Sequence, residues 1–193
     1  MVLQVKDGDR IQEENGEQIV ITPQDKINVH NFGPASSRDD IVNTCQRPGG
    51  ETADGNKIDA TTSVDEWMQF MSTKGIKHAF ILLSDNELED YIEPGLISAY
   101  EAVGITAHHI PIASKGSYQK IMAELDSLYD EGEKAVAHCT HGMGRSGRVA
   151  AGWLVYKYGL TSEAATEEVL ESARMHGVER MGAPRLLNEW IAN

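Results

Sequence analysis

One junction organises this chain, and it has the sequence Lys134-Ala-Val-Ala-His138-Cys139-Thr140-His141-Gly142-Met143-Gly144-Arg145-Ser146-Gly147. Its first five residues include a short apolar run bounded by turn-forming residues, which predicts a buried β-strand. Glycines follow, and a segment rich in Ala, Val, Trp and Leu from Arg145 to Tyr158 predicts a buried helix. The sequence therefore predicts a strand, a glycine-containing loop and a helix in direct succession.

Such a junction is suited to binding an anion, because the first turn of a helix leaves its backbone N–H groups unpaired. Gly142 and Gly144 permit positive φ angles, so that consecutive N–H groups can point toward one anion. Arg145 stands where the helix begins, and its planar guanidinium can contact two phosphate oxygens at once. We therefore predict a phosphate-binding loop made of Thr140, His141, Gly142, Met143, Gly144 and Arg145.

Cys139 directly precedes this loop, so its sulfur is expected at the floor of the phosphate site. The loop amides and the helix dipole favour the thiolate form, which is the nucleophilic form of cysteine. Attack on phosphorus would give a phosphocysteine, and the Ser146 hydroxyl would then donate a hydrogen bond to the departing sulfur. We expect His138 to support the loop by hydrogen bonding to backbone carbonyls. The alternative is a loop that only connects a strand to a helix.

The arrangement of His138, Cys139, five further residues, and then Arg145 and Ser146 resembles the signature of the protein tyrosine and dual-specificity phosphatase superfamily. The order of predicted elements from about residue 40 onward is similar to the catalytic core of its compact dual-specificity members. The resemblance implies a metal-independent phosphoric monoester hydrolase without a cofactor. It also implies phosphotyrosine as substrate, and a shallow pocket would extend this to phosphoserine and phosphothreonine.

The rest of the chain alternates between strand-like and helix-like segments, which predicts an α/β fold with a central, mostly parallel sheet flanked by helices. A capping-box pattern predicts a helix starting at Ser63 and ending near Gly75. An acidic loop is expected at 85–93. Further strands are expected at 40–45, 78–83, 105–112 and 134–138, and further helices at 94–103, 117–131, 145–158, 162–175 and 184–192.

A length of 193 residues with 40% apolar residues indicates one globular domain. We assign residues 38–193 to a phosphatase-like catalytic domain. Residues 1–37 form an N-terminal extension packed on or near that core, and residues 18–22 are expected to belong to an edge hairpin.

The chain carries 17 basic and 30 acidic residues and a net charge of −13, which makes nucleic acid an unlikely ligand. No secretory signal pattern and no apolar run of membrane-spanning length is apparent. We therefore expect a cytoplasmic monomer that acts on a phosphorylated protein or a small phosphorylated molecule. With only Cys45 and Cys139, no disulfide framework or metal site is expected.

One feature of the resembled superfamily is missing, namely the Asp that protonates the leaving group from the loop after the preceding strand. Its expected position falls at Ala113 or Ser114, and no carboxylate lies between Ile105 and Gln119. The acid would then come from the acidic loop, with Asp85 as first choice. The other candidates there are Glu87, Glu89 and Asp90. Alternatively, an Asp has been substituted to trap substrate, or the leaving group needs no proton.

A leaving group that needs no proton would be compatible with other functions. Cys139-Thr140-His141-Gly142 also resembles the loop of cysteine-dependent RNA 5′-triphosphatases, although Gly144 stands where those loops carry Asn. Small phosphorylated or pyrophosphorylated metabolites are further candidate substrates. A phosphate-binding pseudophosphatase is the alternative from a different class, and the missing acid is the observation that favours it.

Several other residues are expected to serve the structure. His108 and His109 are adjacent on a strand and would face opposite sides, so we expect packing roles for both. Cys45 is expected to be a core residue, although a protective disulfide with an oxidised Cys139 is the alternative. Arg47 and Arg148 are expected to pair with charges inside the fold, whereas the sequence does not place Arg180 and Arg185.

Overall fold

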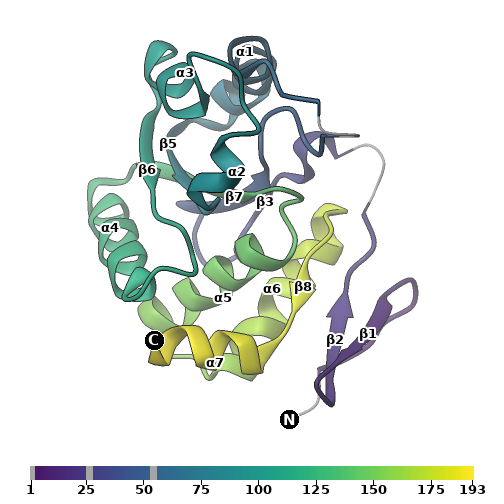
Figure 1. Cartoon of the computed structure of the whole chain (residues 1–193). Coiled ribbons are helices and arrows are strands. Elements are labelled where there is room, and N and C mark those ends of the chain that lie inside the picture. The colour runs from purple at the N-terminus through teal and green to yellow at the C-terminus, as the bar shows by residue number, and fades with distance from the viewer. Residues whose placement is uncertain (1–2, 25–27, 53–55) are drawn as a thin grey trace.

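A computed structural model describes residues 3–24, 28–52 and 56–193 of the chain. Its centre is a five-stranded sheet of strand order β3-β4-β7-β5-β6 (Figure 1). All neighbouring strands in it are parallel except β3, which is antiparallel to β4. The bounds are β3 Gly33–Pro34, β4 Val42–Gln46, β5 Ile76–Ile81, β6 Thr106–His109 and β7 Lys134–Cys139. The predicted α/β fold with a mostly parallel sheet is confirmed.

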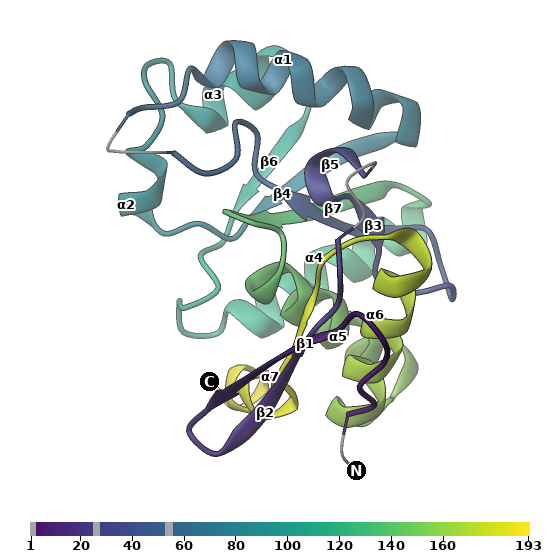
Figure 2. The same ribbon diagram turned by 90° about the vertical axis from the view of Figure 1, so that its right-hand side faces the viewer.

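Helices cover both faces of this sheet (Figures 1 and 2). One face carries α1 (Ala60–Met71) and α3 (Leu96–Ala102), and the other carries α4 (Ser117–Glu131), α5 (Gly144–Tyr158), α6 (Ser162–His176) and α7 (Pro184–Ala192). Two apolar clusters fill the two interfaces, and β7 contributes Val136 to one and Ala137 and Cys139 to the other. Because side chains alternate along a strand, β7 is buried on both faces.

Most predicted elements are present, and two local differences have identifiable causes. Helix α1 begins at Ala60 and not at Ser63, because the Asp59 side chain caps it by accepting a hydrogen bond from the Thr62 amide. The predicted acidic loop contains the one-turn helix α2 (Asp85–Leu88). Its capping box joins Ser84 and Glu87, a spacing that the sequence analysis did not use.

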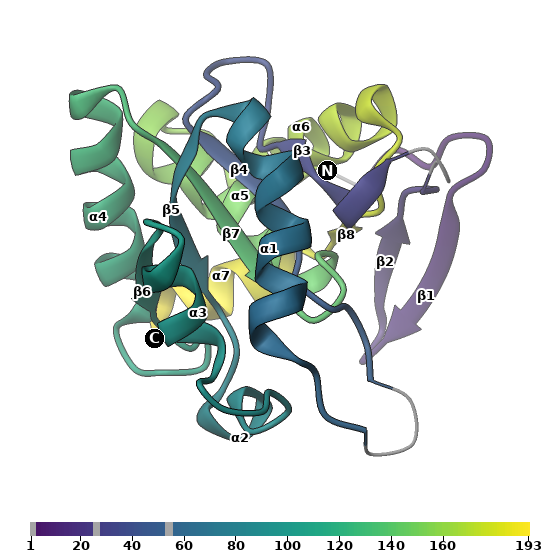
Figure 3. The same cartoon turned by 90° about the horizontal axis from the view of Figure 1, so that it is seen from above.

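The N-terminal segment is built into the fold by two strand contacts. Strands β1 (Arg10–Glu14) and β2 (Glu17–Ile21) form an antiparallel hairpin, and β2 pairs with β8 (Met181–Gly182). Figure 3 shows this hairpin beside β8 at the periphery of the molecule. The chain then passes through the 3₁₀ turns η1 (Val29–Asn31) and, after α1, η2 (Ser72–Lys74). Since β3 belongs to the central sheet, structure continues across residue 37, and the division at that point stays a prediction.

Among the described residues, no helix combines the length and the apolar character that crossing a membrane requires.

The loop before β4 is fixed to the helical layer by one carboxylate. Asp39 accepts hydrogen bonds from the Ile41 and Val42 amides at 2.9 and 3.3 Å. It also accepts from Trp153 Nε1 at 2.9 Å and from the Tyr158 hydroxyl at 2.7 Å, both on α5. One side chain therefore joins the start of β4 to the helix that follows the phosphate-binding loop.

We expect Asp39→Ala to lower the free energy of unfolding by about 2–4 kcal/mol, because it leaves the donors of the fully buried Trp153 and the half-buried Tyr158 without an acceptor. Asp40→Ala is the matched control. The neighbouring Asp40 side chain is 74% exposed and, among the described residues, forms an ion pair with Lys134 alone, so its loss should cost about 1 kcal/mol or less. Urea denaturation of both variants measures the difference, and equal losses would contradict the role assigned to Asp39.

Candidate phosphate-binding site

The loop between β7 and α5 starts at the carboxyl end of a central strand. The Cys139 carbonyl accepts a hydrogen bond from the Arg47 amide at 2.9 Å, and the His138 carbonyl accepts from the Leu82 amide at 3.1 Å. Cys139 is 3% exposed, and its side chain belongs to the apolar cluster under α5. Both neighbouring strands thus hold the nucleophile predicted from sequence in a fixed position.

The backbone N–H groups of the loop are unpaired as far as residues 3–24, 28–52 and 56–193 are concerned. In the described part of the chain, none of the amides of residues 140–145 donates a hydrogen bond to another protein group. The first backbone bond of the following turn runs from the Gly147 amide to the Met143 carbonyl at 3.1 Å. Unpaired amides at the start of a 15-residue helix are able to bind an anion, which is the role that the sequence predicts for this loop.

Gly142 gives the loop its shape. Its φ angle is 74°, and a Cβ atom at this position would lie 2.5 Å from the Cys45 carbonyl carbon and 2.6 Å from the Gln46 amide nitrogen. The loop therefore rests directly on the backbone of β4. The Asn31 side chain holds the next turn by donating a hydrogen bond to the His141 carbonyl at 3.0 Å. Only glycine fits this position without displacing β4.

Ser146 lies in the first turn of α5, next to the cysteine. Its side chain is fully buried, and its Oγ atom is 3.2 Å from Cys139 Sγ, close enough to donate a hydrogen bond to the sulfur. Such a bond stabilises negative charge on sulfur.

Arg145 contacts a carboxylate that the sequence analysis ranked below Asp85. Its Nη1 and Nη2 atoms donate to Glu87 Oε2 and Oε1, both at 2.7 Å, in a bidentate pair. The Thr140 hydroxyl completes the cluster, at 3.0 Å from both Arg145 Nη2 and Glu87 Oε1. The Arg145 guanidinium lowers the pKa of Glu87 to about 2. The capping box that sets Glu87 at the third position of α2 is the sequence signal that identifies it.

His138 makes a different contact from the one expected. It was predicted to hydrogen bond to backbone carbonyls, but its Nε2 atom lies 3.0 Å from the buried Tyr100 hydroxyl. Its Nδ1 atom has no partner among the described residues. Burial, with further contributions from the Arg47 and Arg145 charges, lowers the pKa of His138 to about 3. The imidazole is therefore neutral at ordinary pH.

The acids considered as proton donors lie in different surroundings. The Asp85 side chain is 91% exposed, and its Oδ1 atom lies 3.9 Å from His109 Nε2. Asp90 pairs with the buried Arg47 at 2.8 Å, and Glu89 is exposed. Glu87 contacts the site but is held in its ionised form by Arg145. Ala113 and Ser114, where the superfamily acid was expected, are exposed in the turn after β6. The role of Asp85 as the proton donor stays a prediction.

Three further residues considered in the sequence lie outside the cluster around Arg145. His108 lies between His78 Nδ1 at 3.1 Å and Glu124 Oε2 at 2.6 Å, as a packing residue. Cys45 is fully buried and belongs to the cluster on the opposite face of the sheet from Cys139. This placement favours the core role over the disulfide. His141 is half exposed, 3.3 Å from Glu51.

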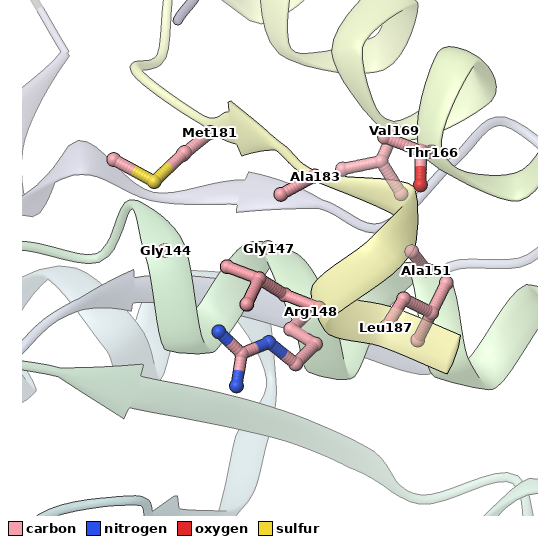
Figure 4. A pocket seen from close by; sticks show the side chains of 10 residues that line it. Gly144, Gly147, Arg148, Ala151, Thr166, Val169, Met181, Ala183 and Leu187 are labelled. Atoms are coloured by element: carbon pink, nitrogen blue, oxygen red, sulfur yellow. The ribbon is translucent and has the colours of Figure 1, made fainter. Parts of the chain in front are cut away.

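A small pocket lies behind the first turn of α5, between α6, β8 and α7 (Figure 4). Figure 4 shows Met181 and Arg148 near the start of α5, with Val169 and Leu187 at the other end. Most of its lining is apolar, so it adds no second cluster of phosphate donors. It shows instead that β8 packs closely on α5, with the Met181 carbonyl 3.2 Å from a Cβ position at Gly147.

A family model and the curated relatives of this chain carry the same name. A family model described as cyclin-dependent kinase inhibitor 3 (CDKN3) matches residues 11–166. The human protein named cyclin-dependent kinase inhibitor 3 is 33% identical over 139 residues, which are 69% of this chain and 62% of that protein. The rat protein of the same name is 28% identical over 162 residues, covering 81% of this chain and 68% of the relative.

Solved structures share the fold. A structure of kinase associated phosphatase, with serine in place of its catalytic-site cysteine, superposes with a TM-score of 0.61 at 26% identity. The match covers 77% of this chain and 83% of that one. The active form of the phosphatase Tk-PTP has a TM-score of 0.57 at 25% identity, covering 82% and 95% of the two chains.

We expect Gly142→Ala to abolish oxyanion binding at the loop, because the added methyl group meets the backbone of β4. Gly132→Ala is the matched control, since Gly132 has a similar φ of 71° but open space around it. Both variants should lose about 1 kcal/mol of stability from the positive φ alone. Vanadate titration checks the result, and retained binding by Gly142→Ala would contradict this account of the loop.

Proposed function

We propose that this chain, which belongs to the cyclin-dependent kinase inhibitor 3 (CDKN3) family of dual-specificity-type protein phosphatases, dephosphorylates proteins through a phosphocysteine formed at Cys139. The family membership confirms the superfamily and the cysteine-dependent phosphatase activity expected from the sequence. One observation carries the assignment of the site: the unpaired loop amides and the Arg145 guanidinium surround the position next to a buried cysteine.

The proposed reaction has two steps. The substrate phosphate is held by the amides of residues 140–145 and by Arg145, and the Cys139 thiolate attacks phosphorus while the bond to the leaving oxygen breaks. The transferred phosphoryl group carries negative charge on its equatorial oxygens, where donors are already fixed. Water then attacks the phosphocysteine, and the Ser146 hydrogen bond stabilises the sulfur as it leaves.

Two residues of the site are proposed to act by positioning. Glu87 fixes the guanidinium of Arg145 through the bidentate pair, and its low pKa of about 2 makes it unsuitable as a proton donor at neutral pH. His138, neutral and bonded to Tyr100, holds the strand end that carries Cys139. Neither residue supplies the proton for the leaving group, so Asp85 or solvent is the proposed source.

The substrate is proposed to be a phosphorylated protein kinase. The relatives bear the names cyclin-dependent kinase inhibitor 3 and kinase associated phosphatase, which point to kinases as their partners. The matched region spans 62% of the human relative. We further propose that the chain acts as a cytoplasmic monomer, since a reducing compartment suits a reactive thiol.

Two alternative functions suggested by the sequence are supported to different degrees. The RNA 5′-triphosphatase alternative is disfavoured by the family and by the net charge of −13. A phosphate-binding module without efficient turnover is favoured by the missing carboxylate at Ala113 and Ser114. It is therefore the second candidate in the activity test.

We expect p-nitrophenyl phosphate to be hydrolysed in EDTA and Cys139→Ser to abolish this hydrolysis. An aryl phosphate with a poorer leaving group should react at least tenfold more slowly, because Glu87, the carboxylate that contacts the site, is ionised and cannot protonate the leaving oxygen. Initial rates of the native protein and of Asp85→Asn on both substrates measure this.

The outcomes separate the candidates. Equal rates on the two substrates, with a steep dependence on the leaving group only in Asp85→Asn, would make Asp85 the acid. If neither substrate is hydrolysed although vanadate binds, the binding module replaces the phosphatase assignment for this chain.

Glu87→Gln is expected to lower kcat/KM for p-nitrophenyl phosphate by about tenfold or more, because the Arg145 guanidinium loses its fixed orientation. Glu89→Gln, two residues away and exposed, is the control that should leave kcat/KM unchanged. An increase in kcat/KM for Glu87→Gln would mean that the carboxylate competes with the substrate phosphate for Arg145.

A further inference from the structure

Arg180 is a charged side chain buried in the core. It lies just before β8 and is 2% exposed, which places it among the largest fully buried side chains. Its donors reach four oxygens: Thr44 Oγ1 and the Thr44 carbonyl, both at 2.9 Å, the Asn31 carbonyl at 2.9 Å and the Glu179 carbonyl at 2.7 Å. All four are neutral, so the guanidinium is well hydrogen bonded but not neutralised.

No carboxylate pairs with this charge within the described residues. Arg47, which is equally buried, is 2.8 Å from Asp90, and Arg174 contacts Asp9, Glu167 and Glu171. A buried cation without an anionic partner is costly, and proteins seldom retain one without a compensating charge. The neighbours of Arg180 indicate which group can supply a compensating negative charge.

Arg180 is bonded to the face of the sheet that carries Cys139. Thr44 is paired with Ala137, and two residues further along the same ladder Gln46 is paired with Cys139. Side chains two apart on parallel neighbours share one face, so Thr44 and Cys139 are diagonal neighbours about 8 Å apart. Arg180 also approaches the first turn of α5, where its Cδ atom lies 3.8 Å from a Cβ position at Gly147.

Among the described residues, the thiols of Cys45 and Cys139 are close enough to Arg180 to interact with its charge. Burial raises the pKa of Cys45 to about 12, so this thiol stays neutral at ordinary pH. Burial lowers the pKa of Arg180 to about 10, so the guanidinium remains a cation there. Cys139 is left as the group that can supply the negative charge.

We propose that Arg180 is a positioning residue for the phosphatase reaction, whose buried positive charge stabilises the Cys139 thiolate and the phosphocysteine that replaces it. The inference rests on the nucleophilic role proposed for Cys139. It adds a fixed positive charge on the sheet face that carries Cys139, next to the first turn of α5, in addition to Arg145 and the loop amides.

The test measures thiolate formation without requiring turnover. Alkylation of Cys139 by iodoacetamide is followed from pH 4 to 9 by mass spectrometry of the peptide that contains it. Arg180→Gln keeps hydrogen-bond donors but removes the charge, and it should raise the pH midpoint of alkylation by about one unit. Arg180→Lys keeps the charge and should restore the native midpoint.

Arg174→Gln is the matched control, because Arg174 is also largely buried but is paired with carboxylates. It should lower the melting temperature and leave the midpoint unchanged. The proposal is overturned if folded Arg180→Gln has the native midpoint, or if Arg174→Gln shifts the midpoint equally.

A second measurement uses the native chain, in case Arg180→Gln does not fold. The Nε–H resonance of Arg180 should titrate with the same midpoint as the alkylation, and it should not titrate in Cys139→Ser. A resonance that does not move with pH would overturn the proposal. Since neither measurement depends on hydrolysis, a chain that binds phosphate without turnover would still show the coupling.

Discussion

The structure depends on a constraint at the start of α5, where unpaired amides must face an anion while the helix itself stays buried. Hydrogen bonds fix this turn from three directions: the Arg47 amide to the Cys139 carbonyl, Asn31 to the His141 carbonyl, and the Met181 amide to the Met143 carbonyl. These contacts come from β4, η1 and β8. A helix start that is held on all sides keeps its donors aimed without reorganisation, which is the condition for electrostatic stabilisation of a transition state.

The chain has a net charge of −13, but positive charge is concentrated around Cys139. Arg47, Arg145 and Arg180 lie around the end of β7, and their surroundings differ. Asp90 pairs with Arg47 and Glu87 pairs with Arg145, whereas the hydrogen-bond partners of Arg180 among the described residues are neutral oxygens. Local fields at a buried site follow the nearest groups and oriented amides, so an acidic protein can bind a phosphate dianion.

The N-terminal segment contributes to this site although it carries no chemistry of its own. Thr22 exchanges hydrogen bonds with the segment before β8, accepting from the Arg180 amide at 2.8 Å. Asn31 accepts from the Glu179 amide at 2.8 Å and also holds the loop through His141. Residues before 37 thereby connect the C-terminal segment to the phosphate-binding loop, which explains why the extension is packed so closely.

The sequence by itself determined the fold class, the helices at 117–131 and 184–192, and the group formed by Cys139, the loop, Arg145 and Ser146. These were accessible because strand, loop, nucleophile and helix are contiguous, so that local periodicity and glycine positions define them. Tertiary structure alone decided the contacts between distant segments. Glu87 lies 58 residues from Arg145, Tyr100 lies 38 residues from His138, and Arg180 lies 136 residues from Thr44. No local pattern encodes such pairs, because they arise from the order in which parallel strands and their loops meet at one edge of the sheet.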